Sequence, residues 1–215
     1  MIDLHTHTIF SDGELLPNEL AIRAESMGLK ILAITDHVDS SNLDFVIPRI
    51  VKVCSDINKY STVRVIPGAE ITHVNPNFIG ELAAKARSLG AKVIIAHGET
   101  IVEPVVSGTN RAALEADIDI LAHPGLISET DVSLAKERGI FLEITGRKGH
   151  SLTNGHVASL ASKIGAKMSF GSDSHSHSDL VPYEQMLRIL KGAGLGDKEV
   201  ESVFKDVESF TSKII

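Results

Sequence analysis

Two histidines near the start of the chain, His5 and His7, stand two positions apart after a short apolar run. In an extended strand, residues i and i+2 point to the same face. Both imidazoles can therefore reach one metal ion at about 2.0–2.1 Å, the usual distance between a histidine nitrogen and zinc. The pair predicts a metal centre, and later His, Asp and Glu residues are candidates to complete it.

Residues of the metal-binding types also follow most of the later apolar runs. They are His37 in Thr35-Asp36-His37, Glu70 in Gly68-Ala69-Glu70, His97, His123, and Asp173 with His175. Histidine and carboxylate ligands suit zinc, iron or manganese, and the lack of cysteine ligands favours a hydrolytic or Lewis-acid centre over a structural one. The candidates exceed what one four-coordinate ion can use. We therefore expect two or three divalent ions.

The elements that must position these residues are indicated by apolar, β-branched runs about 25–30 residues apart with helical periodicity between them. The predicted strands are residues 2–4, 31–34, 63–66, 93–96, 118–122, 140–144 and 167–170. The predicted helices are residues 17–27, 43–60, 78–89, 111–116, 133–138, 156–164, 183–191 and 198–215. This alternation favours an α/β fold, a closed or nearly closed seven-stranded barrel, with an open sheet as the alternative. No linker divides residues 1–215, so one domain is expected.

The barrel would gather the candidate ligands in one place. In a parallel barrel the carboxyl ends of all strands lie on one rim, so residues far apart in sequence converge there. Six of the seven predicted strands would place His, Asp or Glu at this mouth. A lone histidine is more often a core or surface residue, but that explanation would have to hold separately at six strand ends.

Composition limits the classes of function. Lys and Arg number 21 and Asp and Glu 28, a net charge of −7, which argues against an extended nucleic-acid partner. The single cysteine, Cys54, excludes an intrachain disulfide and is expected to pack in the core. The start of the chain lacks the pattern of a signal peptide, and no apolar run is long enough to span a membrane. We expect a cytoplasmic protein without a membrane partner.

The ordered motifs of the chain, taken together, are specific. They are His5-Thr6-His7 with Ser11-Asp12-Gly13, Thr35-Asp36-His37, Gly68-Ala69-Glu70, Ala96-His97-Gly98, His123-Pro124 and Ser172-Asp173-Ser174-His175. This series resembles the PHP (polymerase and histidinol phosphatase) family over nearly the whole chain. The resemblance implies a distorted (β/α)7 TIM-like barrel with a trinuclear metal site that hydrolyses phosphoesters.

The resemblance also implies a division of the ligands among three ions. One ion would be bound by His5, His7, Glu70 and Asp173, a second by Glu70, His97 and His123, and a third by Asp12, His37 and His175. Many relatives have histidine at the position of Asp12, and an oxygen ligand there favours a harder ion. Metal-activated water would attack phosphorus while the ions stabilise the developing charge.

Other residues near the predicted rim are candidates for substrate binding or catalysis. Arg147 follows the sixth strand and is suited to clamp a phosphate, with Lys148 a weaker candidate and a solvated loop pair the alternative. Glu99, two residues past His97, is a candidate acid for the leaving alcohol, or it supports a metal ligand. His73 either orients substrate or caps the next helix.

Four more polar residues are assigned neither a metal ion nor a catalytic step. Asp3, Asp36 and Glu143 are interpreted as acceptors that fix imidazole tautomers. His150 flanks a loop that helix capping explains without catalysis.

The first hypothesis for function is a phosphatase acting on a small phosphomonoester, with histidinol phosphate the best-known substrate of the family. The alternative is a 3′–5′ exonuclease or other nuclease on single-stranded nucleic acid, and a third possibility is a non-catalytic scaffold subunit. The filled ligand positions argue against the scaffold. A zinc amidohydrolase also begins with His-x-His in a barrel, but it lacks an expected partner for the Ser172-Asp173-Ser174-His175 ending. The expected partner is a small phosphorylated substrate, and nothing in the sequence predicts an oligomeric state.

Overall fold

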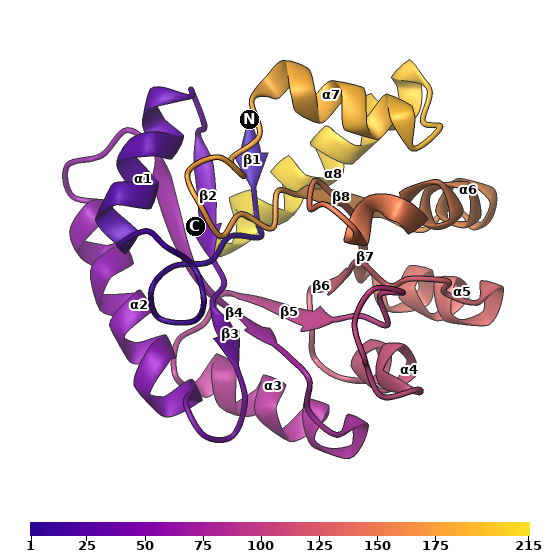
Figure 1. Ribbon diagram of the computed structural model, residues 1–215, viewed down its shortest axis with the longest axis horizontal. Helices are drawn as coiled ribbons and strands as arrows, with labels where there is room; N and C mark the ends of the chain where they lie inside the picture. The colour runs from indigo at the N-terminus through magenta and orange to yellow at the C-terminus, as the bar shows by residue number, and fades with distance from the viewer.

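In the computed structural model, which describes residues 1–215, parallel strands form one sheet that curls into an almost closed barrel (Figure 1). The strands are β1 (Ile2–Asp3), β2 (Ile31–Ile34), β3 (His37–Val38), β4 (Arg64–Ile71), β5 (Val93–His97), β6 (Ile120–Ala122), β7 (Phe141–Thr145) and β8 (Met168–Gly171). Their order around the ring is β1-β2-β4-β5-β6-β7-β8, and the short β3 pairs with β4 off this path. The predicted seven-stranded (β/α)7 TIM-like barrel is confirmed.

Helices cover the outside of the ring (Figure 1). They are α1 (Pro17–Ser26), α2 (Leu43–Ile57), α3 (Ile79–Ser88), α4 (Thr109–Glu115), α5 (Glu129–Arg138), α6 (Asn154–Ile164), α7 (Tyr183–Gly192) and α8 (Asp197–Ile214), with short 3-10 turns η1 (Pro76–Phe78) and η2 (His150–Thr153). The structure has α5 beginning at Glu129 rather than at the predicted residue 133, because the Ser128 side chain accepts a hydrogen bond from the Asp131 backbone and caps the helix there. None of these helices combines the length and the hydropathy that a membrane crossing requires.

Strand β4 is longer than the predicted run at residues 63–66 and changes partners along its length. Its first half pairs with β2, and its second half pairs with β3 and β5. Glu70 therefore lies within the strand rather than after it, directly opposite His37 of β3. Glycine at position 68 allows the strand to continue at this point. A Cβ there would lie 2.7 Å from the Val93 carbonyl oxygen, so only glycine fits.

The barrel closes between β1 and β8 only at their carboxyl ends. Thr6 and Ser174 form an isolated parallel bridge. On either side of it, the Asp173 backbone N–H donates to the His5 carbonyl at 2.9 Å and the His7 N–H donates to the Ser174 carbonyl at 2.9 Å. The backbone of the His-x-His and Ser-Asp-Ser-His motifs is thus itself the seam that closes the ring.

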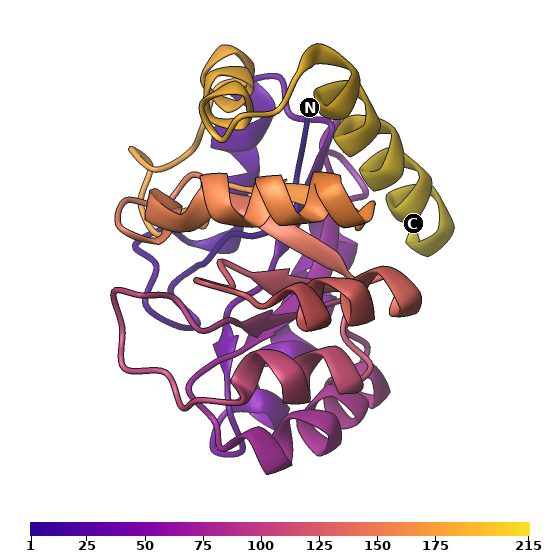
Figure 2. The same cartoon turned by 90° about the vertical axis from the view of Figure 1, so that its right-hand side faces the viewer.

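Two apolar clusters hold the fold together. The larger one, of 49 buried residues, includes apolar side chains of every helix and most strands. The smaller one has nine buried residues, with at least one from each of β2, β4, β5, β6 and β7: Leu4, Ala33, Ile66, Val93, Ile95, Ile120, Ala122, Phe141 and Val207. Val207 comes from α8, which lies on the side of the molecule opposite the loops that follow the strands (Figure 2). Helix α8 therefore closes the amino end of the barrel, and the polar residues gather at the other end.

Candidate metal centre

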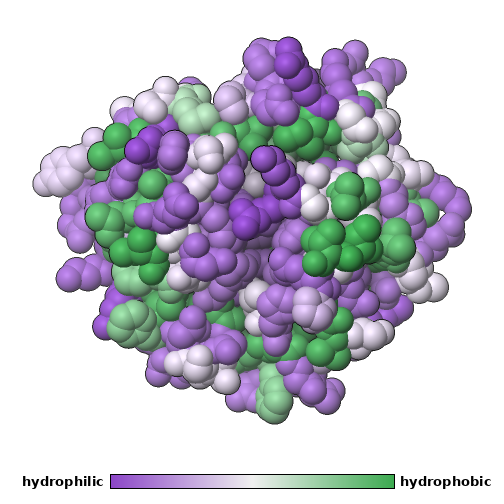
Figure 3. Space-filling model, in the orientation of Figure 1, coloured by the Kyte–Doolittle hydropathy of each residue, from purple (hydrophilic) through white to green (hydrophobic).

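The carboxyl ends of the strands surround a polar cavity of about 450 Å³. Of the sixteen residues that line it, Val38 is the only hydrophobic one. In the space-filling view the hollow at the centre of this face is lined by hydrophilic side chains (Figure 3). The arrangement suits a charged ligand rather than an apolar one.

All nine residues that the sequence proposes as metal ligands are brought together at this rim. They form four overlapping groups whose ligand atoms lie within 4.8 Å of one another: His7-Asp12-His37-His175, His5-His123-Asp173, His5-His7-Glu70 and Glu70-His97-His123. The deepest of the nine, His5, His7 and Glu70, are fully or almost fully buried. Because Glu70 and Asp173 each face several histidines, either carboxylate can link two neighbouring ions.

The distances between ligand atoms fit metal coordination. The Nε2 atom of His5 lies 3.3 Å from Oε2 of Glu70, and Nε2 of His7 lies 3.3 Å from Oδ1 of Asp173. Two ligands of one tetrahedral zinc ion, each about 2.0 Å from it, are themselves about 3.3 Å apart. The spacing is therefore compatible with atoms that share one ion.

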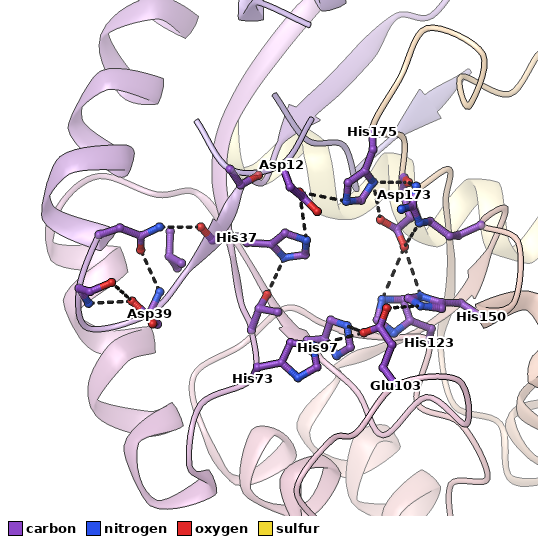
Figure 4. Close-up of a pocket in the computed structure, with 16 residues that line it drawn as sticks. Asp12, His37, Asp39, His73, His97, Glu103, His123, His150, Asp173 and His175 are labelled. Atoms are coloured by element: carbon purple, nitrogen blue, oxygen red, sulfur yellow. Dashed lines mark hydrogen bonds and ion pairs between the residues drawn. The ribbon is translucent and has the colours of Figure 1, made fainter. Parts of the chain in front are cut away.

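The outer group has the same spacing. The Oδ1 atom of Asp12 lies 3.4 Å from Nε2 of His37 and 3.1 Å from Nε2 of His175. Dashed lines join both imidazoles to the Asp12 carboxylate (Figure 4). This carboxylate is more exposed than the inner ones, so an ion held here would be the one nearest to solvent.

Several buried polar atoms at the centre have no hydrogen-bond partner. They include Nε2 of His5, Nε2 of His7 and both carboxylate oxygens of Glu70. An unsatisfied buried polar group destabilises a fold by about 1–3 kcal/mol, and a charged one by more. Divalent cations would satisfy all four atoms at once. The residues present therefore fit a metal cluster.

Two of the inner residues, Glu70 and His7, have the protonation state that a metal ligand needs. Burial raises the pKa of the Glu70 carboxyl, but the His5 and His37 imidazoles outweigh it and hold that pKa well below its usual range. Burial lowers the pKa of His7 to about 3, so its imidazole is neutral near pH 7 and has a free lone pair. Metal ligands must be deprotonated in this way before they bind an ion.

Glu143, from β7, holds two of the histidines in place. Its Oε1 lies 2.7 Å from Nδ1 of His5, and its Oε2 accepts a hydrogen bond from the His123 backbone at 3.1 Å. A Cβ at Gly171 would overlap the Glu143 carboxylate and lie 2.7 Å from the His5 Cβ, so glycine is required beside them. The role predicted for Glu143 matches this contact.

The same role predicted for Asp3 and Asp36 does not match the structure. The Asp3 carboxylate accepts hydrogen bonds from the backbone of His5 and Ser172, and that of Asp36 accepts them from the Thr8 backbone and from nearby hydroxyl groups. These two aspartates hold the loops rather than the imidazole rings.

Backbone strain is concentrated around the cavity. His73, His123 and Asp173 are the only non-glycine residues with positive φ, at 52°, 29° and 53°, and all three line the cavity. Such conformations cost about 1–3 kcal/mol each and cluster at functional sites. The backbone strain therefore indicates a functional site at this rim, and this indication does not depend on the residue types found there.

The predicted substrate-binding residues are placed differently from one another. Arg147 lines the cavity, and its NH1 group donates to the Asp173 carbonyl at 3.3 Å. His73 also lines it, with Nε2 3.3 Å from the Glu103 carboxylate. Lys148 does not reach this cavity and lines a neighbouring one instead.

Glu99 is not brought to the site. Its carboxylate accepts hydrogen bonds from the backbone N–H groups of Gly108 at 3.0 Å and Asn110 at 2.9 Å, at the start of α4. The predicted role in protonating the leaving group has no support in this geometry, because the carboxylate caps a helix and does not line the cavity.

Two residues at the site were given no catalytic or metal-binding role from the sequence. Glu103 lies 3.1 Å from Nε2 of His97 through one oxygen and 3.1 Å from Nε2 of His150 through the other (Figure 4). His150 also lies 3.4 Å from Asp173. The hydrogen bond to His97 lowers the pKa of Glu103 to about 2. The sequence feature that could have identified His150 is its position after the sixth predicted strand, which places it on the same rim as Arg147.

Fold and site together define a barrel protein with several groups of candidate metal ligands at the carboxyl ends of its strands. The profile of the PHP domain matches residues 3–179, and the chain belongs to that family. The family predicted from the ordered motifs is confirmed.

The chain is also similar to individual proteins along most of its length. The chain is 45% identical over 202 residues to an uncharacterized protein of Methanocaldococcus jannaschii, covering 93% of each. It is 28% identical over 218 residues to a probable phosphatase of Thermoanaerobacter sp., covering 91% of this chain and 87% of the relative. Among solved structures it is similar to the candidate histidinol phosphatase HisK of Listeria monocytogenes, with a TM-score of 0.61 at 14% identity, over 84% of this chain and 97% of that one. At that identity the likeness shows the fold alone.

Proposed function

We propose that this protein is a metal-dependent phosphatase that hydrolyses a small phosphomonoester. The observation that carries the proposal is the convergence of nine His, Asp and Glu side chains in four groups at the mouth of a PHP-family barrel. The name of the probable phosphatase that is 28% identical over 218 residues points the same way. Histidinol phosphate, or another small phosphorylated metabolite, is the substrate type we infer.

The four groups suggest how the ions are held. In the division that the family resemblance implies, His5, His7, Glu70 and Asp173 would bind one ion, Glu70, His97 and His123 a second, and Asp12, His37 and His175 a third. The second of these sets is one of the four groups, the third lies within another, and the first combines residues of two groups. Zinc, manganese or iron bound there would polarise the phosphate and would lower the pKa of a bound water to a value near neutrality. The ligand types suit any of these metals.

The chain's own residues prepare the site. Glu143 orients His5 through Nδ1, which leaves Nε2 directed at Glu70. Arg147 is the only lysine or arginine that lines the cavity. Its NH1 group is anchored on the Asp173 carbonyl, so the remaining N–H groups can donate to phosphate oxygens. Arg147 therefore positions the anion beside the metal ligands.

Charge and size favour a small substrate over a nucleic acid. The net charge of −7 and the single arginine at the cavity provide no groove that would follow a phosphate backbone. A cavity of about 450 Å³ is within the usual range for small-molecule sites.

The test combines elemental analysis of the purified protein with a panel of phosphomonoesters and single-stranded oligonucleotides, with manganese or zinc added. We expect bound divalent metal and hydrolysis of phosphomonoesters. Asp173→Asn and His123→Ala should lose more activity than the 10–100-fold typical of residues that only support a metal ligand. His156→Ala is the matched control, because His156 contacts the Ile127 carbonyl away from the cavity. Release of mononucleotides without hydrolysis of phosphomonoesters would contradict the phosphatase and favour the nuclease.

A further inference from the structure

A second cavity of about 480 Å³ adjoins the metal cavity. It lies between the segment after β7, the segment after β8 and the start of α7, and it shares Arg147 and Asp173 with the metal cavity. Arg147 therefore stands at the boundary between the two spaces. A molecule bound at the metal ligands can extend past this arginine into the second cavity.

The second cavity has its own cation. Lys148 is exposed and lines this cavity but not the metal cavity. Lys148 is therefore not placed to contact a phosphate in the metal cavity, whereas Arg147 borders both cavities.

The carboxylates of the second cavity are already engaged. The Asp179 carboxylate accepts hydrogen bonds from the backbone of His175 at 3.2 Å and of Ser176 at 2.8 Å, and also from the Ser176 hydroxyl at 2.9 Å. Asp173 belongs to the candidate metal groups, so a bound ion would neutralise its charge. With ions in place, Arg147 and Lys148 outnumber the one remaining carboxylate.

Arg147 also has unused donors. Only its NH1 group makes a hydrogen bond, to the Asp173 carbonyl. The same NH1 group lies 3.7 Å from the Asp179 carboxylate, and Nε lies 3.9 Å from the nearest Asp173 carboxylate oxygen. A guanidinium has five N–H donors in one plane and can bind two oxygens side by side. It can therefore contact acidic groups on both sides of the boundary.

From this arrangement we propose that the second cavity binds a second anionic group of the substrate. The natural substrate is then a phosphomonoester that carries another phosphate or a carboxylate, bound by Lys148 and Arg147 while the first phosphate lies at the metal ligands. The inference rests on the proposed phosphatase function and names its substrate class.

The test uses three matched sets of straight-chain compounds of increasing length. They are the monophosphates of diols, the bisphosphates of the same diols, and the phosphates of the corresponding hydroxy acids. Each is assayed with the metal-loaded enzyme. At one or more spacer lengths, the doubly anionic substrates should have kcat/KM about tenfold or more above the monophosphate, mainly through KM, as one added charge-assisted contact would give. The bisphosphate and hydroxy-acid sets show which acid is preferred.

Lys148→Gln should lower the ratio of kcat/KM between doubly and singly anionic substrates toward one. Lys163→Gln is the matched control, because Lys163 is exposed on α6 and pairs with Glu129. Binding of alkane bisphosphonates and monophosphonates, which are not hydrolysed, gives the same ratio by calorimetry. A ratio near one at every spacer length, or a ratio that Lys148→Gln leaves unchanged, overturns the inference while the phosphatase stands. Failure to hydrolyse any member of the three sets would instead overturn the phosphatase itself.

Discussion

Replacing Glu143 with glutamine tests how the barrel holds two of its buried histidines. Both carboxylate oxygens are used, one 2.7 Å from Nδ1 of His5 and the other 3.1 Å from the backbone nitrogen of His123. Glutamine has the same shape but only one acceptor oxygen, and its amide nitrogen is a donor. One of the two partners must therefore face the wrong group.

Either orientation of the amide disturbs the site. If the amide nitrogen faces His5, its Nδ1 must accept the hydrogen bond and the ring proton moves to Nε2. That atom lies 3.3 Å from the Glu70 carboxylate and would no longer offer a lone pair to a metal ion. If the amide nitrogen faces the His123 backbone, two donors oppose each other.

The expected loss can be estimated from these contacts. One hydrogen bond to a charged group contributes about 1.5–3 kcal/mol, which corresponds to a metal affinity roughly 10–100-fold weaker, the range found when a group that supports a metal ligand is removed. Competition between the protein and a chromophoric chelator for zinc or manganese measures the affinity directly. Glu137→Gln, an exposed position on α5, is the matched control. If Glu143→Gln bound metal as tightly as this control, the tautomer argument would be refuted.

Three further predictions concern stability and reactivity. Removing metal with a chelator should lower the unfolding temperature by about 5–11 °C, the equivalent of about 2.7 kcal/mol for ions present at 100 times their Kd, and an unchanged calorimetric transition would contradict the metal site. Glu99→Ala should lower stability by about 1 kcal/mol through loss of the α4 cap and leave kcat/KM nearly unchanged, whereas loss of turnover at unaltered stability would restore a catalytic role. Burial raises the pKa of the Cys54 thiol to about 12, so at pH 8 only about one thiol in 10,000 is ionised and iodoacetamide should label it only after unfolding; rapid labelling of the folded protein, followed by mass spectrometry, would contradict this.

The sequence predicted the ring of strands and the convergence at its rim because both follow from periodic features. Six of the seven apolar runs end near a residue of metal-binding type, and parallel strands bring those ends together. The pairing of His37 with Glu70 was not predictable in the same way. It depends on β4 continuing past Pro67-Gly68, a dipeptide that usually ends a strand, and this continuation requires the close approach of Gly68 to Val93.

Side chains in the loops were harder to assign. Glu99 and Glu103 lie on the same segment, and the sequence does not tell which carboxylate faces the cavity. Glu99 turns to the backbone at Gly108 and Asn110, whereas Glu103 turns to the histidines. The choice depends on where α4 begins, a tertiary feature. His150 was likewise assigned to a capping loop, although the short η2 turn places its ring beside Asp173.

The most direct test of the metal centre is anomalous diffraction from crystals of the protein loaded with zinc or manganese. The account predicts two or three anomalous peaks at the carboxyl rim, within bonding distance of His5, Glu70 and Asp173 in the interior and of Asp12 and His175 nearer to solvent. If crystals soaked in a solution of the metal showed no anomalous peak among these side chains, the result would contradict the proposed metal centre.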